Sequence, residues 1–239
     1  LSKESLPKAR KKVQLIAGWD LGNRDYRDEI LESSRASTVR LALQAIADAQ
    51  GDVDAFIAQY DEKTRKVPRI AADIVQRLLA VGRVEDAWST IEATEHGRRD
   101  WPDFEWEDAR IDVLEAFGRS DEAQAARWSC FERSLSAPHL RAYLKQLPDF
   151  DDLEAEELAL DHAREYTSLL QALSFFVSWP DLDRAASLVI ERAGELDGNH
   201  YEFLTPAAHA LAGKHPLAAT LVLRAMVDFS LTQGRSSRY

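Results

Sequence analysis

The chain has 239 residues, 45% of them hydrophobic and 30% charged, a composition that excludes an intrinsically disordered protein. The net charge of −11 repels polyphosphates over most of the surface, which argues against nucleic acid as a general partner. All apolar runs are shorter than the ~20 residues that cross a bilayer, so we expect no membrane partner.

The single cysteine, Cys130, excludes an intrachain disulfide and a multi-cysteine zinc site. A chain of this kind suits a reducing compartment, and no signal-peptide pattern opens it, so we predict a cytoplasmic location. The sequence begins at Leu1 and ends directly after a helical pattern, so we expect a fragment of a longer protein.

The pattern of apolar residues predicts an all-α protein. Residues 1–36 are the least regular and are expected to form an irregular helical N-terminal segment, whereas residues 37–239 are expected to form one helical-repeat domain. The domain opens with a helical face made by Val39, Leu43 and Ile46. A second helix is predicted from residue 53 to 60, and the charged residues 63–66 are predicted to connect it to the next pair.

Pro68 begins the clearest amphipathic helix, and its partner follows Gly82. Asp100 is placed to cap the next helix, with Pro102 in its first turn. Ser136 and Pro138 repeat this cap-and-proline start.

The last third of the chain continues the pairs. Acidic residues dominate a predicted helix from residue 151 to 165. Near the start of this helix they stabilise it, because negative charge interacts favourably with the positive end of the helix dipole. Pro206 is expected in the first turn of a later helix, because proline in a helix interior removes a hydrogen bond.

Two turns have matching sequences, Gly82–Ala87 and Gly118–Ala123, and each places alanine five residues after glycine. Aligning all the predicted turns gives one alanine per helix pair, at Ala55, Ala87, Ala123, Ala155, Ala185 and Ala218. A small residue early in the second helix lets two backbones cross closely. The period of 30 to 36 residues indicates an α-solenoid of about six stacked helix hairpins, and an irregular helical bundle is the alternative.

These turns resemble the inter-helix turn of tetratricopeptide repeats, and Pro68, Pro102 and Pro138 resemble the proline at the end of that repeat. The tryptophan, leucine-glycine and tyrosine positions of the family's first helix are not matched, and Phe150 and Pro180 replace glycine in later turns. The resemblance therefore implies a tetratricopeptide-like fold, and no binding residues follow from it.

Two further stretches, Arg77–Ser89 and Ser174–Ala186, resemble an uncharacterised bacterial family known only as a domain of unknown function. This second resemblance implies a helical-repeat fold and no particular chemistry.

Catalytic and metal-binding motifs are not evident. The six histidines lack the spacing of a zinc hydrolase, and we predict that all of them are surface or capping residues. Cys130 falls in an apolar stripe beside Trp128 and Phe131, where it is expected to pack as a small core residue. We therefore predict no enzyme activity, no cofactor and no metal.

The function that fits such a chain is binding of a protein or peptide on the concave face made by the first helix of each pair. The polar residues predicted to contact the partner are Arg40, Arg69, Asp73, Arg77 and Arg110. The exposed apolar face of a terminal helix also favours a homodimer.

Two alternatives remain open. The domain could be the structural part of a larger protein whose activity lies elsewhere. The loop around Arg98 and Arg99 could instead bind an anion or nucleic acid, because paired guanidinium groups grip carboxylates and phosphates.

Overall fold

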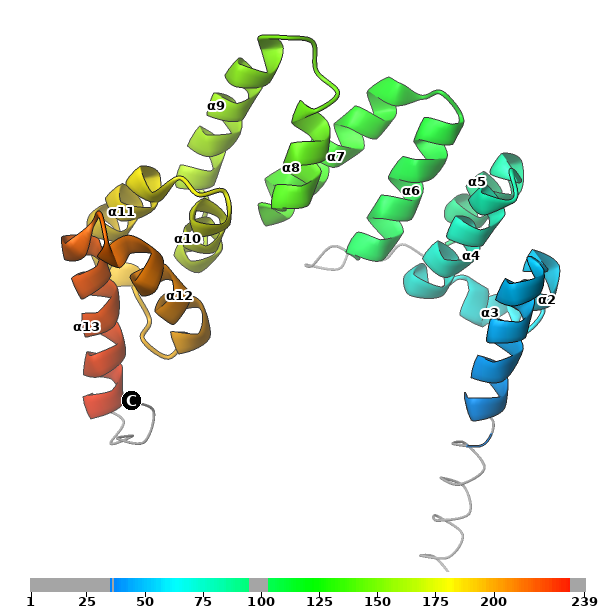
Figure 1. Cartoon of the computed structure of the whole chain (residues 1–239), viewed down its shortest axis with the longest axis horizontal. Coiled ribbons are helices and arrows are strands. Elements are labelled where there is room, and N and C mark those ends of the chain that lie inside the picture. Colours follow the sequence, from blue (N-terminus) through cyan, green and yellow to red (C-terminus); the bar gives the residue numbers. More distant parts are fainter. Residues whose placement is uncertain (1–34, 36, 95–102, 233–239) are drawn as a thin grey trace, which may run out of the picture. The chain divides into compact units, whose positions relative to one another are not determined.

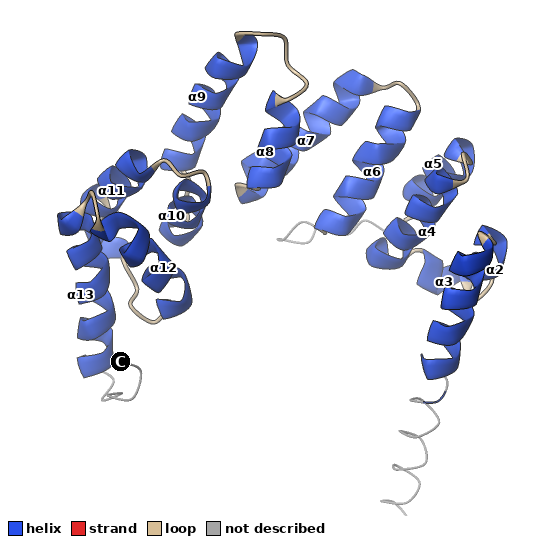
Figure 2. Ribbon diagram, in the orientation of Figure 1, coloured by secondary structure: helices blue, strands red, loops and turns tan. Residues whose placement is uncertain are grey.

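The computed structural model describes residues 35, 37–94 and 103–232, and every regular element in these residues is helical (Figures 1 and 2). The prediction of an all-α protein is therefore confirmed. The chain divides into two compact units between residues 95 and 96, and each unit is described separately. The predicted N-terminal segment lies almost entirely outside the described residues.

The first unit is built around α4. It comprises a helical segment over residues 37–50, followed by α2 (Val53–Ile57), α3 (Glu62–Arg65), α4 (Pro68–Ala80) and α5 (Val84–Ala93). Helices α2, α3 and α5 all pack on α4. The amphipathic pattern of α4 explains this position, since Ala71, Ile74, Val75 and Leu78 are almost completely buried.

The helix predicted through Val39, Leu43 and Ile46 is present but does not bury that face, and the predicted charged connector is wrong. Val39, Leu43 and Ile46 are about half exposed, and the buried apolar residue of that helical segment is Ala47. Residues predicted as a charged connector form the one-turn helix α3, because the side chain of Asp61 accepts a hydrogen bond from the backbone N–H of Thr64.

The second unit contains a longer series of packed helices. Its members are α6 (Phe104–Ala116), α7 (Ser120–Ser134), α8 (Ala137–Leu144), α9 (Asp151–Arg164), α10 (Leu169–Ser178), α11 (Leu182–Glu191), the short 3₁₀ helix η1 (Ala193–Glu195), α12 (Tyr201–Ala212) and α13 (Pro216–Thr232). Each helix from α6 to α11 packs on the next, and contacts also join α10 to α12 and α11 to α13. One apolar core continues from α7 to α13, with Phe131, Leu173, Phe176 and Leu211 fully enclosed.

The turns between paired helices share one backbone geometry. Gly51, Gly82 and Gly118 have positive φ angles of 66°, 77° and 72°, the left-handed region in which glycine carries no steric penalty. In these turns the N–H of the following residue donates to the carbonyl five residues earlier, with N–O distances of 2.9 Å for Asp52, Arg83 and Arg119. The matching sequences of the second and third turns thus have matching structures.

Later turns keep part of this geometry without glycine. Phe150 has a φ of 77°, although its side chain carries the steric cost that glycine avoids. At the next turn, which contains Pro180, the N–H of Asp181 donates to the carbonyl of Phe176 at 3.0 Å. Tertiary packing therefore preserves the turn where the sequence signal is lost.

The predicted alanine series is correct at four of its six positions. Ala87, Ala123, Ala185 and Ala218 are at most 1% exposed, as expected for residues at a close helix crossing. The other two positions are corrected: Ala55 is exposed and Ala155 is only half buried. In α9 the fully buried alanines are Ala159 and Ala163, because the buried face of that helix begins later than the turn alignment implies.

Pro206 also differs from its predicted place. Helix α12 begins at Tyr201, so Pro206 lies in the helix interior and not in the first turn. Both Pro206 and Glu202, whose carbonyl would otherwise accept the missing N–H, are exposed. Water can satisfy that carbonyl, which lowers the cost of an interior proline.

Candidate functional site

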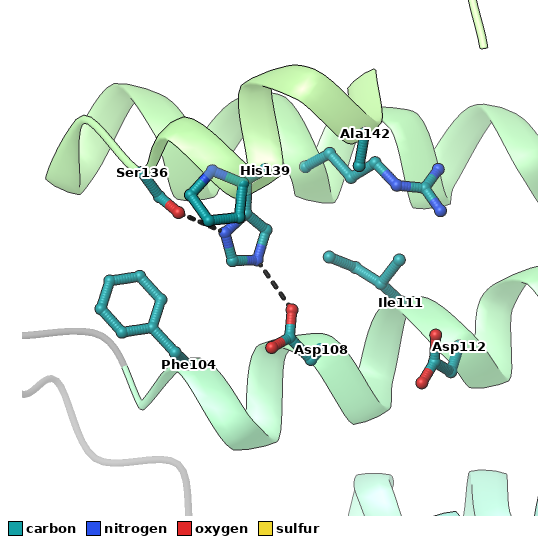
Figure 3. Close-up of a pocket in the computed structure, with 9 residues that line it drawn as sticks. Phe104, Asp108, Ile111, Asp112, Ser136, His139 and Ala142 are labelled. Atoms are coloured by element: carbon teal, nitrogen blue, oxygen red, sulfur yellow. Dashed lines mark hydrogen bonds and ion pairs between the residues drawn. The ribbon is translucent and has the colours of Figure 1, made fainter. Parts of the chain in front are cut away.

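A pocket of about 490 Å³ lies between α6 and α8 in the second unit (Figure 3). Its lining comes from three helices and the turn before α8, and comprises Phe104, Asp108, Ile111, Asp112, Arg127, Ser136, Pro138, His139 and Ala142. The lining brings charged groups of α6, such as Asp108, together with His139 of α8 and Arg127 of α7, beside apolar side chains such as Ile111. The pocket therefore combines features that recognise both polar and apolar parts of a ligand.

Local sequence positions both walls of the pocket. The side chain of Asp103 caps α6 by accepting a hydrogen bond from the N–H of Trp106 at 3.3 Å. Because α6 begins at this point, Phe104, Asp108 and Asp112 fall on one row of the helix, four residues apart. The opposite wall begins where Leu135, with a left-handed φ of 52°, ends α7 and turns the chain into α8.

His139 is the central polar residue of the pocket, and its side chain is only 6% exposed. Its Nδ1 lies 2.7 Å from the Oγ atom of Ser136, and its Nε2 lies 3.0 Å from Oδ1 of Asp108 (Figure 3). The contact with Asp108 is an ion pair without good hydrogen-bond alignment, because Nε2 has no partner of acceptable hydrogen-bond geometry. The ring thus links α8 to α6 through its charge.

Opposing effects set the pKa of His139. Burial lowers the pKa, but the Asp108 carboxylate and the sulfur of Cys130 outweigh burial and raise the pKa to about 9. His139 is therefore protonated at neutral pH. A serine, a histidine and an aspartate are adjacent here, but a protonated imidazole cannot take a proton from the Ser136 hydroxyl, so this arrangement does not favour general-base catalysis.

An ion pair with one buried partner joins α6 to α7 in the same unit. Glu107 is only 3% exposed, and its carboxylate pairs with the guanidinium of Arg133 at 2.5 Å. The same guanidinium donates a weak hydrogen bond to the Cys130 sulfur at 3.9 Å. Cys130 itself is fully buried, as predicted, so a substrate has no access to its sulfur.

Arg127 forms the third buried polar group of this region. Its side chain is 10% exposed, and its guanidinium lies 2.8 Å from a Glu115 carboxylate oxygen and donates to Oε1 of Gln124 at 2.9 Å. These contacts fix the guanidinium at the edge of the pocket. The charged lining is therefore held in place by contacts within the chain before any ligand arrives.

The residues predicted to contact a partner do not gather at this pocket. Arg69 and Asp73 are exposed on α4, and Arg40 is exposed on the helical segment 37–50. Arg77 is occupied within the first unit: its Nε and Nη2 atoms donate to the Asp48 carboxylate at 2.6 and 2.9 Å. Its guanidinium also lies 3.7 Å from the centre of the Phe56 ring, which further fixes the side chain.

The remaining predicted residues are elsewhere. Arg110 lies on α6, where its Nη1 is 3.8 Å from Glu107, and it does not line the pocket. Arg98 and Arg99 lie outside the described residues, as does Asp100. The role of all these residues in binding stays a prediction.

The prediction that all six histidines are surface or capping residues is wrong for His139. The error has a physical cause, because the burial of His139 depends on α6, whose Asp108 lies 31 positions earlier in the sequence. One local signal was present: Ser136 stands three residues before His139, the spacing at which a capping side chain meets the first turn. In the structure that hydroxyl contacts the imidazole in place of the backbone.

Metal binding and membrane insertion find no support in the described ranges. Across residues 37–94 and 103–232, three or more histidine, cysteine or acidic side chains nowhere gather as metal ligands. In the same part of the chain, each helix is too short or too polar to cross a bilayer.

The described residues form packed helices, with a pocket of mixed polar and apolar lining between α6 and α8. The whole chain, residues 1–239, matches a family described as a family of unknown function (DUF6880), and the chain belongs to that family. This agrees with the predicted resemblance to an uncharacterised family, while its bacterial origin stays a prediction. No curated protein and no solved structure is significantly similar to the chain.

Proposed function

We propose that the chain is a protein- or peptide-binding scaffold, built as a tetratricopeptide-like α-solenoid of about six helix hairpins. The recurring left-handed turns after the first helix of a pair support this architecture. So do ion pairs between the second helices of successive pairs: Arg83, which precedes α5, lies 2.7 Å from Asp54 of α2, and Arg184 of α11 lies 2.6 Å from Glu157 of α9. Contacts of this kind repeat when similar units stack.

The pocket between α6 and α8 is the single observation that carries the proposed function. In the solenoid, α6 and α8 are the first helices of successive pairs, so the groove between them belongs to the face that such proteins use for binding. Its charged groups are fixed by their own ion pairs, which reduces the entropy lost on binding. We expect this groove to be the centre of the interface.

The lining of the groove suits an extended peptide. Phe104 and Ile111 offer apolar surface to a side chain of the peptide, while Asp108 and Asp112 accept hydrogen bonds from N–H groups. Arg127 of α7 also lines the groove, and the N–H groups of its guanidinium that its partners leave available would donate to peptide carbonyls. A peptide presents donors, acceptors and apolar side chains in alternation, which matches this mixture.

The proposal is tested by selecting peptides from a random display library against the whole chain and measuring their affinity by calorimetry. Ala142 lines the groove, and Ala142→Tyr fills it with an aromatic ring. Ala125→Tyr makes the same change at an exposed position of α7 and is the matched control. We expect the groove variant to weaken the selected peptides at least about tenfold, a loss of roughly 1.4 kcal/mol, with the control unchanged.

Two results would reject this function. Selection that yields no peptide above the background of an unrelated protein removes the binding role. Peptides that bind Ala142→Tyr as tightly as the unchanged chain place the interface elsewhere. Circular dichroism of both variants, compared with the unchanged chain, shows whether the fold is retained.

A further inference from the structure

Helix α13 has two different faces. One face packs on α11 and α12 in the second unit (Figure 1). That face buries Ala219, Val222 and Met226. A neighbouring row on the same helix is exposed and apolar, with Leu223 49%, Val227 45% and Leu231 75% exposed. These three residues are four positions apart, so they form one continuous stripe. Large aliphatic side chains in a continuous row are costly to leave in water.

A pair of opposite charges borders this stripe. Arg224 and Asp228 follow Leu223 and Val227 directly in sequence, so they lie along the same flank of the stripe. Their side chains are 74% and 62% exposed, and Nε of Arg224 lies 3.4 Å from Oδ2 of Asp228. At such exposure the pair contributes little to the stability of the helix itself. Both charges remain accessible to a partner helix.

We propose that this stripe of α13 is a homodimer interface in which two copies pack their α13 helices antiparallel about a twofold axis between Met226 and Val227. Reversal of direction about this point places Leu223 within one residue of the partner's Leu231, so the apolar row is complementary to itself. The same operation places Arg224 within one residue of the partner's Asp228 on the shared flank. A surface that supplies both halves of the apolar contact and both charges fits a second copy of the chain.

This interface is independent of the proposed peptide groove, because the two use different helices. Each copy would contribute the same stripe, so the dimer contains two equivalent Arg224–Asp228 contacts. Apolar burial supplies the affinity, and the charges select the antiparallel arrangement. Exposed charges of this kind contribute mainly to the choice of partner and orientation.

The test measures molar mass by sedimentation equilibrium of the full chain over a range of concentrations. We expect a monomer–dimer equilibrium for the unchanged chain and a loss of dimer for Val227→Glu, which buries a charge at the centre of the contact. Ile190 of α11 is 47% exposed, so Ile190→Glu makes the same change on another surface and should leave the dimer intact. Circular dichroism establishes that both variants are folded.

Charge reversal tests the antiparallel register separately. Arg224→Asp alone and Asp228→Arg alone each place like charges opposite one another twice per dimer, and we expect each to weaken the dimer about tenfold. An equimolar mixture of these two variants should recover the affinity, because an acidic stripe then faces a basic one. A monomeric unchanged chain, a dimer that survives Val227→Glu, or a mixture that fails to form a heterodimer would each overturn the proposal.

Discussion

Gly198 lies so close to the backbone of α13 that a side chain at this position has no room. It is buried between η1 and α12, against the backbone of α13. A methyl group built on Gly198 would lie 2.1 Å from the carbonyl oxygen of Ala225 and 2.8 Å from Cα of Met226. An ordinary contact is at least 3.4 Å, so the overlap exceeds 1 Å. The backbone of Gly198 fixes the position of the added methyl group, and the atoms that it meets are backbone atoms of α13, so no side-chain rotation relieves the clash.

We therefore expect Gly198→Ala to force the loop away from α13. Overpacking in a well-packed region costs about 1–3 kcal/mol, and we expect the upper end, about 3 kcal/mol, because the backbone itself must move. Urea unfolding followed by circular dichroism measures this free energy. Gly194→Ala is the matched control, since an added Cβ at Gly194 meets no atom within 4 Å. A Gly198→Ala midpoint equal to that of the control would refute the close approach of this loop to α13.

The turns and the pocket give three more predictions. Gly82→Ala puts a side chain on a backbone with a φ of 77°, and it should lower the free energy of unfolding in urea by about 1–2 kcal/mol. Gly213 has a right-handed conformation, so Gly213→Ala should lower that free energy much less. Phe150→Gly should be stabilising by up to about 1 kcal/mol, because it relieves a φ of 77° at a residue that is 81% exposed; a lower urea midpoint would contradict this. Since the pKa of His139 is raised from 6.5 to about 9, its ion pair stabilises fully below pH 6.5 and is lost as pH rises through about 9. The raised pKa corresponds to at most roughly 3 kcal/mol of folding free energy, which solvent screening reduces to about 1–2 kcal/mol because Asp108 is 61% exposed. Asp108→Asn should therefore flatten the dependence of unfolding free energy on pH between pH 6 and 10. An unchanged dependence would contradict the pairing of His139 with Asp108.

The sequence anticipates some features of the pocket region and misses others. The helix that carries Phe104 and Asp108 follows from the local pattern, and the burial of Cys130 follows from its apolar neighbours. The role of His139 could not be anticipated, because its ionic partner lies on another helix. Arg77 shows the converse. Its guanidinium, predicted to contact a partner, instead pairs with Asp48, 29 residues away in the same chain.

The turns show where local physics is sufficient. Gly82 and Gly118 mark left-handed residues because only glycine adopts that conformation without a steric penalty, so the conformation has a direct signature in the sequence. Phe150 adopts the same conformation without that signature, since the packing of the flanking helices fixes the turn and outweighs the local cost. Pro206 likewise lies inside α12 because tertiary contacts hold a helix that proline alone would interrupt.

The sequence by itself determined that this chain is helical, that its helices are short, and where most of them turn, because periodicity, proline and glycine act over a few residues. The tertiary structure alone decided which charges pair, which histidine is buried, and which apolar rows, such as that of α13, stay exposed. Those outcomes depend on contacts between helices that are distant in sequence. Apolar residues also recur along both faces of a helix, so their spacing cannot indicate which face a neighbour covers.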